Sequence, residues 1–305
     1  MTRIITLDLH FLGVPGAIAS YLIPHAHGAL LIESGPGSTV PALQAGLRQH
    51  GFTEKDVTAV FLTHIHLDHA GAAGWLARQG AQVYVHPVGA PHLLNPEKLL
   101  ASATRIYGDQ MELLWGEFLP VPADCLTVFE DNQVVEIGGI RLRALDTPGH
   151  ANHHNVYLVD DVCFTGDFAG IRMAQTGFIG IPMVPPEFLL EKWRESLSKL
   201  QSEYQQGSFY RLAPTHFGVF QDAAWHLARL AKALDEVEAW MEAIMPAQPD
   251  EGQLTAEFLA WTDRQMHAEG LNPLQIQAYG LANPPSVSVP GMRRYWNKFR
   301  STGAG

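Results

Sequence analysis

Short apolar runs alternate with amphipathic segments between residues 28 and 87, and this alternation limits the possible folds more than any other feature. The runs GALLIES, VTAVFLTH and AQVYVHP have the length and composition of buried strands. Between them lie STVPALQAGLRQHG, in which Ser38 or Thr39 is placed to cap a helix, and AGAAGWLARQG. We interpret both segments as helices. A β-α-β-α-β order predicts an α/β layered fold.

A helical pattern interrupts the strands at residues 95–118. Asn95 is placed to cap a helix with Pro96 at its first position, and apolar residues at 99, 100, 103, 106 and 107 share one face. Strands resume afterwards, with a hairpin turn expected at IGGI, residues 137–140. Residues 221–305 again look helical. We therefore predict one domain at 1–220 with an insert at about 95–118, and a helical C-terminal extension at 221–305 packed on the same domain.

Composition excludes some classes of protein. The chain has 305 residues, of which 47% are hydrophobic and 17% charged, so it can bury a sizeable core. Its net charge of −11 is opposite to what phosphate contacts need, which argues against a nucleic-acid partner. Two cysteines make no disulfide framework, and we find neither a secretory leader nor an apolar run of about 18 residues. We expect a cytoplasmic protein without a membrane partner.

The stretch LTHIHLDHAGAAG, residues 62–74, concentrates titratable groups directly after a predicted strand. It places His64, His66, Asp68 and His69 within six positions. Imidazole and carboxylate groups are suitable ligands for zinc, and also for manganese or iron. A metal site is therefore the leading interpretation of this stretch.

Three more candidate ligands follow predicted strands elsewhere in the chain. They are His150 after RLRALDTPG, Asp167 after VCFTG and His216 after YRLAPT. Loops at the carboxyl ends of strands converge in α/β sheets, so we expect all seven side chains at one site. Seven ligands exceed what one tetrahedral ion uses, whereas two ions that share a carboxylate use them all.

The stretch THIHLDHAG resembles the H-x-H-x-D-H signature of the metallo-β-lactamase superfamily. The segments LLIESGPG, DTPGHANHH, FTGD and PTHFG resemble four further motifs of this family in the family's order, although Glu33 replaces the usual Asp in the first. The resemblance covers residues 5–220 and implies an αββα sandwich. More narrowly, HPVGAPHLLNPEKLLAS and GMRRYWNKF resemble an uncharacterised bacterial and archaeal hydrolase subgroup.

The resemblance also implies an arrangement of ligands. The first ion is held by His64, His66 and His150, the second by Asp68, His69 and His216, and Asp167 bridges them. Two divalent ions per chain are implied, with zinc preferred and manganese or iron as alternatives. Asp68 is also the expected catalytic residue, which orients the nucleophile or moves its proton.

The expected function is a metal-dependent hydrolase in which a metal-bridging hydroxide cleaves an ester, thioester or lactone of a small metabolite. Known acyl-homoserine lactonases have a tyrosine where this chain has Gly170, and many zinc β-lactamases have Cys or Ser in place of Asp167. Two alternatives remain. One is a mononuclear iron persulfide dioxygenase, and the other is a non-catalytic metal-binding module.

Several residues have open roles. His154 either orients a metal ligand or makes an ordinary polar contact, and His153 is equally open. His86 and His92 flank a proline-containing turn and are expected at the surface or in packing, unless the insert brings one over the site. The insert itself is either a wall of the site or a subunit interface. The basic and aromatic residues near the C-terminus, 293–300, are expected on a packed terminal helix, with a homo-oligomer interface as an alternative.

Overall fold

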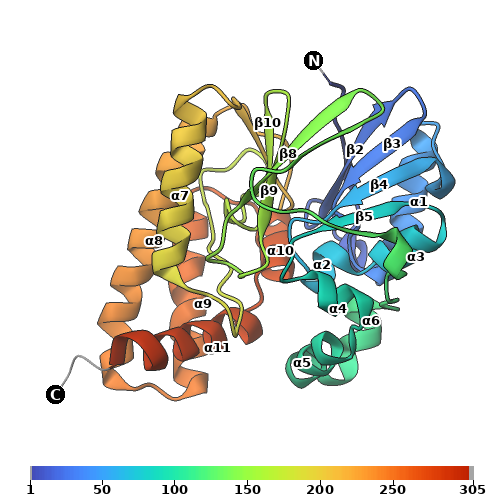
Figure 1. Cartoon of the computed structure of the whole chain (residues 1–305). Coiled ribbons are helices and arrows are strands. Elements are labelled where there is room, and N and C mark those ends of the chain that lie inside the picture. Colours follow the sequence, from blue (N-terminus) through green and yellow to red (C-terminus); the bar gives the residue numbers. More distant parts are fainter. Residues whose placement is uncertain (1, 302–305) are drawn as a thin grey trace.

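The computed structural model describes residues 2–301 and consists of two β-sheets packed face to face, with helices on both outer faces (Figure 1). The first sheet has the order β1-β2-β3-β4-β5-β6, with bounds Ile5–Asp8, Ala19–His25, Gly28–Ile32, Val57–Phe61, Gln82–Val85 and Leu126–Val128. The second has the order β11-β10-β9-β8-β7, with bounds Arg211–Pro214, Val162–Gly166, Asn155–Val159, Ile140–Asp146 and Val134–Ile137. The predicted αββα sandwich is confirmed.

Helices α1 and α3 lie against the first sheet, and α7 and α8 cover the second (Figure 1). The first six helices are α1 (Val40–Gln49), α2 (Leu67–Ala70), α3 (Ala73–Arg78), α4 (Ala90–Leu94), α5 (Glu97–Tyr107) and α6 (Met111–Trp115). The last five are α7 (Leu190–Gln205), α8 (Ala223–Ile244), α9 (Glu251–Ala268), α10 (Pro273–Ala282) and α11 (Pro285–Tyr295). No helix within residues 2–301 combines the length and apolarity that a membrane crossing needs.

Alternating side chains of the strands build the layers. In β2, Tyr21 and Ile23 belong to the apolar cluster between the two sheets, whereas Leu22 belongs to the cluster under the helices of the first sheet. Leu158 and Cys163 of the second sheet join a third cluster with α7 and α8. Successive side chains of a strand point to opposite faces, so strands with apolar residues on both faces become buried on both sides.

Strand direction brings the predicted site together. Strands β3, β4 and β5 are parallel in the first sheet. In the second sheet β10 is parallel to β11, and both β8 and β10 are antiparallel to β9, so β8, β10 and β11 run in one direction. The segments that follow β8, β10 and β11 therefore leave the sheet at the same edge, which is where His150, Asp167 and His216 lie in the sequence.

Two local predictions differ in outcome. The IGGI turn is formed between β7 and β8, with Gly138 and Gly139 both at positive φ, as a tight hairpin turn requires. The expected side-chain cap of α1 is wrong, because the Thr39 hydroxyl donates to the carbonyl of Pro36 instead. The Ser38 hydroxyl donates to the carbonyl of Leu114 at 2.6 Å and so ties the start of α1 to α6.

Residues 285–300 form a packed helical segment in which Arg300 is paired with neighbouring acids. Arg300 makes ion pairs with Glu191, Glu238 and Glu242, and the Tyr295 hydroxyl donates to Glu191 at 2.7 Å. These contacts fix the end of the chain to α7 and α8. They agree with the interpretation of residues 293–300 as part of a packed terminal helix.

A cluster around the buried side chains of His226 and Arg172 fastens α8 to the loop that follows β10. The Arg172 guanidinium lies between the rings of Phe220 and Trp225, and it pairs with Asp222 through two bonds of 2.8 Å. Its Nη1 also donates to His226 Nδ1 at 3.2 Å. The opposite nitrogen, Nε2, donates to the carbonyl of Ala169 at 2.9 Å. Both contacts suit a neutral imidazole.

We predict that His226 makes the fold less stable in acid. Burial lowers the pKa of His226 from 6.5 to about 4, so the unfolded chain takes up a proton first as pH falls through this window. The free energy of unfolding therefore decreases between pH 6.5 and pH 4. Between pH 7 and pH 5, the decrease in the free energy of unfolding is expected to be about 2 kcal/mol smaller in His226→Gln than in the wild type, measured by urea unfolding. His50→Gln, at an exposed position, is the matched control, and equal losses in all three proteins would contradict the prediction.

Candidate metal centre

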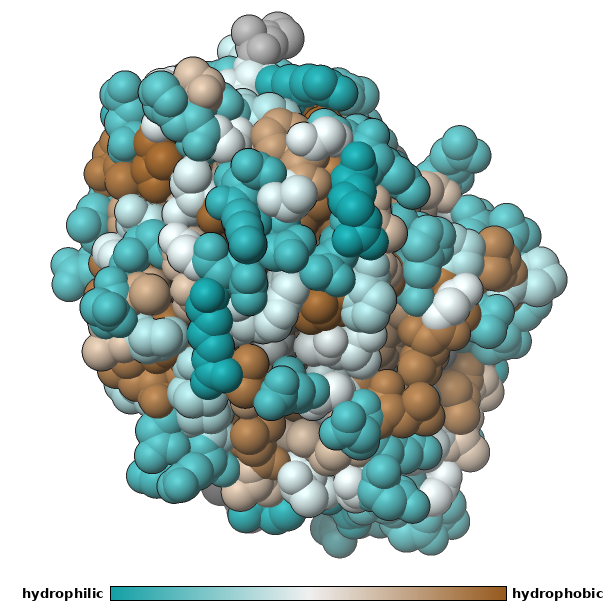
Figure 2. Space-filling model, turned by 90° about the vertical axis from the view of Figure 1, so that its right-hand side faces the viewer, coloured by the Kyte–Doolittle hydropathy of each residue, from teal (hydrophilic) through white to brown (hydrophobic). Residues whose placement is uncertain are grey.

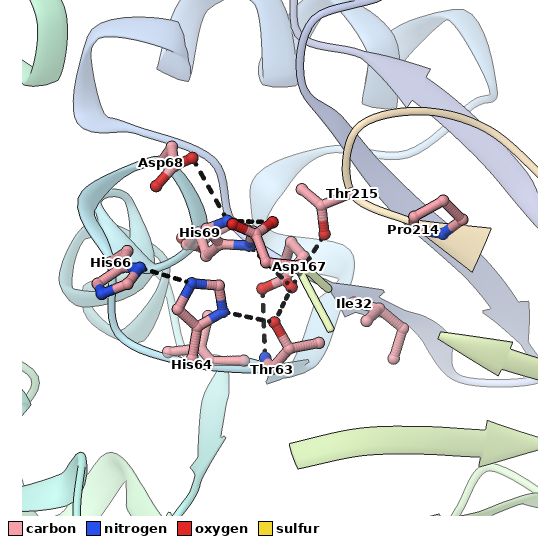
Figure 3. A network of polar contacts seen from close by, with 12 residues as sticks. Ile32, Thr63, His64, His66, Asp68, His69, Asp167, Pro214 and Thr215 are labelled. Carbon is pink, nitrogen blue, oxygen red and sulfur yellow. Dashed lines mark hydrogen bonds and ion pairs between the residues drawn. The ribbon is translucent and has the colours of Figure 1, made fainter. Parts of the chain in front are cut away.

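The seven predicted ligands converge at one edge of the sandwich, in the loops that follow β4, β8, β10 and β11. Figure 3 shows five of them, His64, His66, Asp68, His69 and Asp167. The first cluster consists of His64, His66 and His150, and the second consists of Asp68, His69 and His216. Within each cluster the candidate ligand atoms lie within 4.8 Å of one another. The sequence-based expectation that these segments meet therefore agrees with the geometry.

Asp167 lies between the two clusters. One of its oxygens, Oδ2, is 3.4 Å from His150 Nε2. The other, Oδ1, is 3.3 Å from Nε2 of both His69 and His216. The Asp167 side chain is almost fully buried, so this carboxylate faces both groups of imidazoles out of contact with bulk water. Its two oxygens are thus divided between two candidate ion positions.

The buried polar atoms at the centre lack partners in a way that fits a cation. Among the described residues, His69 Nε2, His216 Nε2 and Asp167 Oδ1 have no hydrogen-bond partner, although each nitrogen lies 3.3 Å from Asp167 Oδ1. Unpaired buried polar atoms are costly, and they persist in native proteins where a further group satisfies them. Nitrogen and oxygen donors without a thiolate suit a catalytic zinc, manganese or iron site.

Hydrogen bonds on the far side of the rings fix which nitrogen points inward. The Nδ1 atoms of His150 and His216 lie 2.8 and 2.7 Å from the carbonyl oxygens of Pro182 and Ala17. His69 Nδ1 is 3.1 Å from Glu33 Oε1. A carbonyl or carboxylate only accepts, so we assign the proton to Nδ1 and the lone pair to Nε2. This is the arrangement that orients an imidazole toward a metal.

Glu33, which replaces the usual Asp of its motif, is the centre of a hydrogen-bond network behind the site. It accepts from the Thr63 hydroxyl and from the Thr63 backbone N–H at 3.3 Å. The Thr215 hydroxyl donates to the same carboxylate at 3.2 Å, and His69 Nδ1 is also bound to it. One fully buried side chain thus joins the loops that carry His64, His69 and His216. Although Glu33, His64 and His69 also lie close enough to hold an ion, these contacts already occupy the Glu33 oxygens.

Gly166 allows the close packing behind the site. Its φ is +52°, a conformation that costs glycine little, and a Cβ at this position would lie 2.8 Å from His154 Nε2. The chain therefore reaches Asp167 through a turn that a larger residue would obstruct. Substitution here would move Asp167 relative to both clusters.

Charge divides the site into two halves. Burial lowers the pKa of His64 and of His150, so both are neutral and able to coordinate at neutral pH. Burial acts in the same direction on His216, but the charge of Asp167 outweighs it and raises the pKa to about 9. The pKa of His69 is likewise raised, because Asp68 and Asp167 outweigh burial. The half of the site that carries the carboxylates therefore attracts positive charge.

The remaining histidines have different positions. His154 stacks on His64 with ring centroids 5.0 Å apart, and its Nδ1 contacts the Thr147 hydroxyl at 3.0 Å. His153 Nε2 is 3.3 Å from Glu187. His86 Nε2 is 3.3 Å from Asp146 at a buried position, which agrees with the packing role expected for it. His92 corresponds to the stated alternative, because it lines the wall of a cavity together with the helices of the insert.

This cavity has a volume of about 530 Å³ and opens onto the site through His66, Asp68 and Asp167. Helices α5 and α6, which occupy most of the predicted insert, form one wall. Tyr107 of α5 is a wall residue that sequence reasoning missed. Burial raises the pKa of its phenol, and the charge of Asp68 adds to the effect. In the sequence, the amphipathic pattern of α5 placed Tyr107 on the apolar face of a helix and gave no other sign of its role.

Comparisons with known proteins agree with the fold and the site. Residues 13–203 match the metallo-beta-lactamase superfamily. The chain is 35% identical over 144 residues to a metallo-beta-lactamase fold-containing protein of Sulfurisphaera tokodaii, covering 46% of this chain and 54% of that protein. It is 30% identical over 187 residues to the atrochrysone carboxyl ACP thioesterase of Aspergillus fumigatus, covering 60% of this chain and 46% of that protein. The chain thus spans about half the length of these curated relatives.

Two solved structures share the fold over nearly the whole chain. An archaeal metallo-beta-lactamase superfamily protein from Sulfolobus tokodaii has a TM-score of 0.66 at 23% identity, covering 96% of this chain and 99% of its own. A metallo-beta-lactamase family protein from Thermus thermophilus has a TM-score of 0.68 at 20% identity, covering 96% and 93%. With the αββα fold and the histidine clusters, these matches show that the chain belongs to the metallo-beta-lactamase superfamily.

We predict that Glu33 controls metal affinity without contacting the ion. Glu33→Gln replaces an acceptor of four contacts by an amide and loosens the orientation of His69. Metal affinity is expected to fall about 10–100-fold, measured by competition with a chromophoric chelator. Glu195→Gln, at an exposed position on α7, is the control that should bind metal like the wild type. Unchanged affinity in a folded Glu33→Gln protein would contradict the positioning role.

Proposed function

We propose that this protein is a metal-dependent hydrolase that cleaves an ester, thioester or lactone of a small molecule. The observation that carries the proposal is the position of Asp167, whose two oxygens face two separate clusters of imidazoles beside a cavity of about 530 Å³. Such a site holds a small molecule next to two candidate ion positions. Two unpaired cysteines suit a reducing cytoplasm, the location we propose.

The donor set fits two divalent ions, with zinc as our preferred assignment and manganese or iron as alternatives. The residues that would hold them are His64, His66 and His150 for one ion, Asp68, His69 and His216 for the other, and Asp167 for both. When bound, two such ions supply an activated water near neutral pH and Lewis acidity toward a carbonyl oxygen.

Within this site Asp68 is suited to orient the attacking water. Its side chain is 18% exposed and lines the cavity, so a substrate reaches it directly. Burial raises the pKa of Asp68, but His69 and His216 outweigh it and hold the carboxyl ionised. Asp68 Oδ2 lies 3.4 and 3.3 Å from those two imidazoles, which restrain its orientation. An ionised carboxylate in a fixed orientation can accept a hydrogen bond from the attacking water and so orient it.

Three observations support acyl substrates. Two of the relatives are atrochrysone carboxyl ACP thioesterases, 30% and 24% identical to this chain, and a thioester belongs to the proposed class of substrates. The sequence contains no G-x-S-x-G motif that would compete as nucleophile, which favours attack by water. The net charge of −11 disfavours polyanionic substrates such as RNA.

We predict that Asp167→Ala lowers metal content and hydrolysis together. One carboxylate serves both ion positions, and its loss leaves two cations to repel each other at short range. Metal content by elemental analysis is expected to fall from about two ions per chain to one or fewer, with turnover reduced at least about 100-fold. Asp263→Ala, an exposed aspartate of α9, is the matched control. Full occupancy with normal turnover in Asp167→Ala would refute the shared role.

We also predict that carboxylic esters, thioesters or lactones are cleaved faster than phosphodiesters. A substrate panel with zinc, manganese and iron reconstitutions measures this directly. Faster phosphodiester cleavage under every metal would overturn the bond assignment. One iron per chain, with oxygen uptake on glutathione persulfide, would favour the dioxygenase instead. Metal binding without turnover of any substrate would favour a non-catalytic binding module.

A further inference from the structure

The cavity beside the metal centre has apolar walls built from segments far apart in the sequence. One wall is α5 and α6, which contribute Leu99, Ala103 and Ile106 among others. The opposite wall is the junction of α10 and α11, with Leu281 and Val287. Figure 1 shows α5 and α10 on either side of the short helix α2, which follows His66. The volume of about 530 Å³ is within the range of small-molecule sites, roughly 300–1,000 Å³.

Few charged side chains line this cavity. Asp68 and Asp167 lie at the metal end. Glu187 is already engaged, because it accepts from the Asn152 backbone N–H at 2.8 Å and pairs with His153. Among the described residues that line the cavity, Lys98 is the sole lysine or arginine, and its side chain is exposed. The walls therefore favour an apolar group over a carboxylate or phosphate.

Gly280 is the unusual residue of the wall. It lies inside α10, where glycine costs about 1 kcal/mol relative to alanine. Its φ is not in the left-handed region, and a Cβ there would meet nothing within 4 Å. Neither backbone conformation nor close packing thus requires glycine at this position. Because Gly280 has no side chain, it leaves space in the cavity that it lines.

Apolar side chains also surround the entrance. Leu12 and Leu113 line the cavity and are 43% and 66% exposed. Leu12 has a φ of +51°, a strained value for leucine, in a loop that Asp8 holds through the N–H groups of His10 and Gly16. The surface in Figure 2 likewise shows hydrophobic groups gathered between hydrophilic ones on one face of the molecule. An apolar ligand that enters the cavity would cover Leu12 and Leu113.

We propose that this cavity binds an apolar acyl chain of the substrate, and that Gly280 sets the length of chain that fits. The inference rests on the proposed hydrolysis and names its substrate class. The scissile carbonyl lies at the end formed by His66, Asp68 and Asp167, and the chain extends between α5–α6 and the α10–α11 junction. Gly280 acts as a specificity-determining residue, because any side chain there occupies the space that the distal part of the chain needs.

The test compares p-nitrophenyl esters of acetate, butanoate, octanoate and dodecanoate. For the metal-loaded wild type, kcat/KM is expected to rise at least about tenfold from acetate to octanoate, since each buried methylene adds up to about fourfold. Gly280→Leu should lose about tenfold on octanoate and stay within about twofold of wild type on acetate. Gly252→Leu, a second exposed helical glycine outside the cavity, is the matched control and should keep the wild-type profile. A flat profile in the wild type, or equal losses on all esters in Gly280→Leu, would overturn the inference.

A binding measurement separates this inference from the proposed hydrolysis. Calorimetric titration with butanoate, octanoate and dodecanoate is expected to show tighter binding with chain length, and Gly280→Leu should weaken octanoate binding more than butanoate binding. This pattern without hydrolysis of any ester supports the apolar pocket and contradicts the hydrolase. Hydrolysis of all esters at one rate, with no dependence of binding on length, contradicts the pocket and leaves the hydrolase supported.

Discussion

The carboxylate of Asp167 is the interaction on which the arrangement of the site depends. Its oxygens contact His150 on one side and His69 and His216 on the other, in a nearly water-free position. A charge in such a place is stable only with positive charge beside it. In this site that charge comes from protonated imidazoles or from bound cations. Histidines from the loops after β4, β8 and β11 all contact this carboxylate, so its position constrains the positions of those loops.

Behind this centre, oxygen acceptors hold the imidazoles in orientation. Glu33 connects Thr63, His69 and Thr215, and the carbonyls of Ala17 and Pro182 hold His216 and His150. Glu33 and Ala17 adjoin strands β3 and β2 of the first sheet, and Pro182 lies in the segment that follows β10 of the second sheet. The two sheets are therefore joined by the apolar layer between them and by the polar contacts that orient the site. A change in the apolar layer or in the polar contacts would therefore shift the candidate metal positions.

The sequence predicted the sandwich fold and the convergence of the candidate ligands, and particular residues show the physical reasons. His64, Asp167 and His216 were found because each follows a strand, and strand direction forces the following loops to one edge. The role of Glu33 was left open, since its four contacts involve residues up to 182 positions away. The insert was expected as a wall of the site or an interface, but the rest of the cavity could not be predicted, because Leu12 and Gly280 meet Tyr107 only through tertiary packing. The Thr39 cap failed because a local carbonyl competed for the hydroxyl.

X-ray absorption spectroscopy on protein purified without added metal distinguishes a two-ion centre bridged by Asp167 from any other metal site. We expect two ions per chain, nitrogen and oxygen ligands with several imidazoles, and a metal–metal distance of roughly 3.5–4 Å. Both cysteines lie outside the candidate ligand clusters, so sulfur scattering should be absent. A single ion with no second metal nearby, or a metal bound through sulfur, would contradict the account.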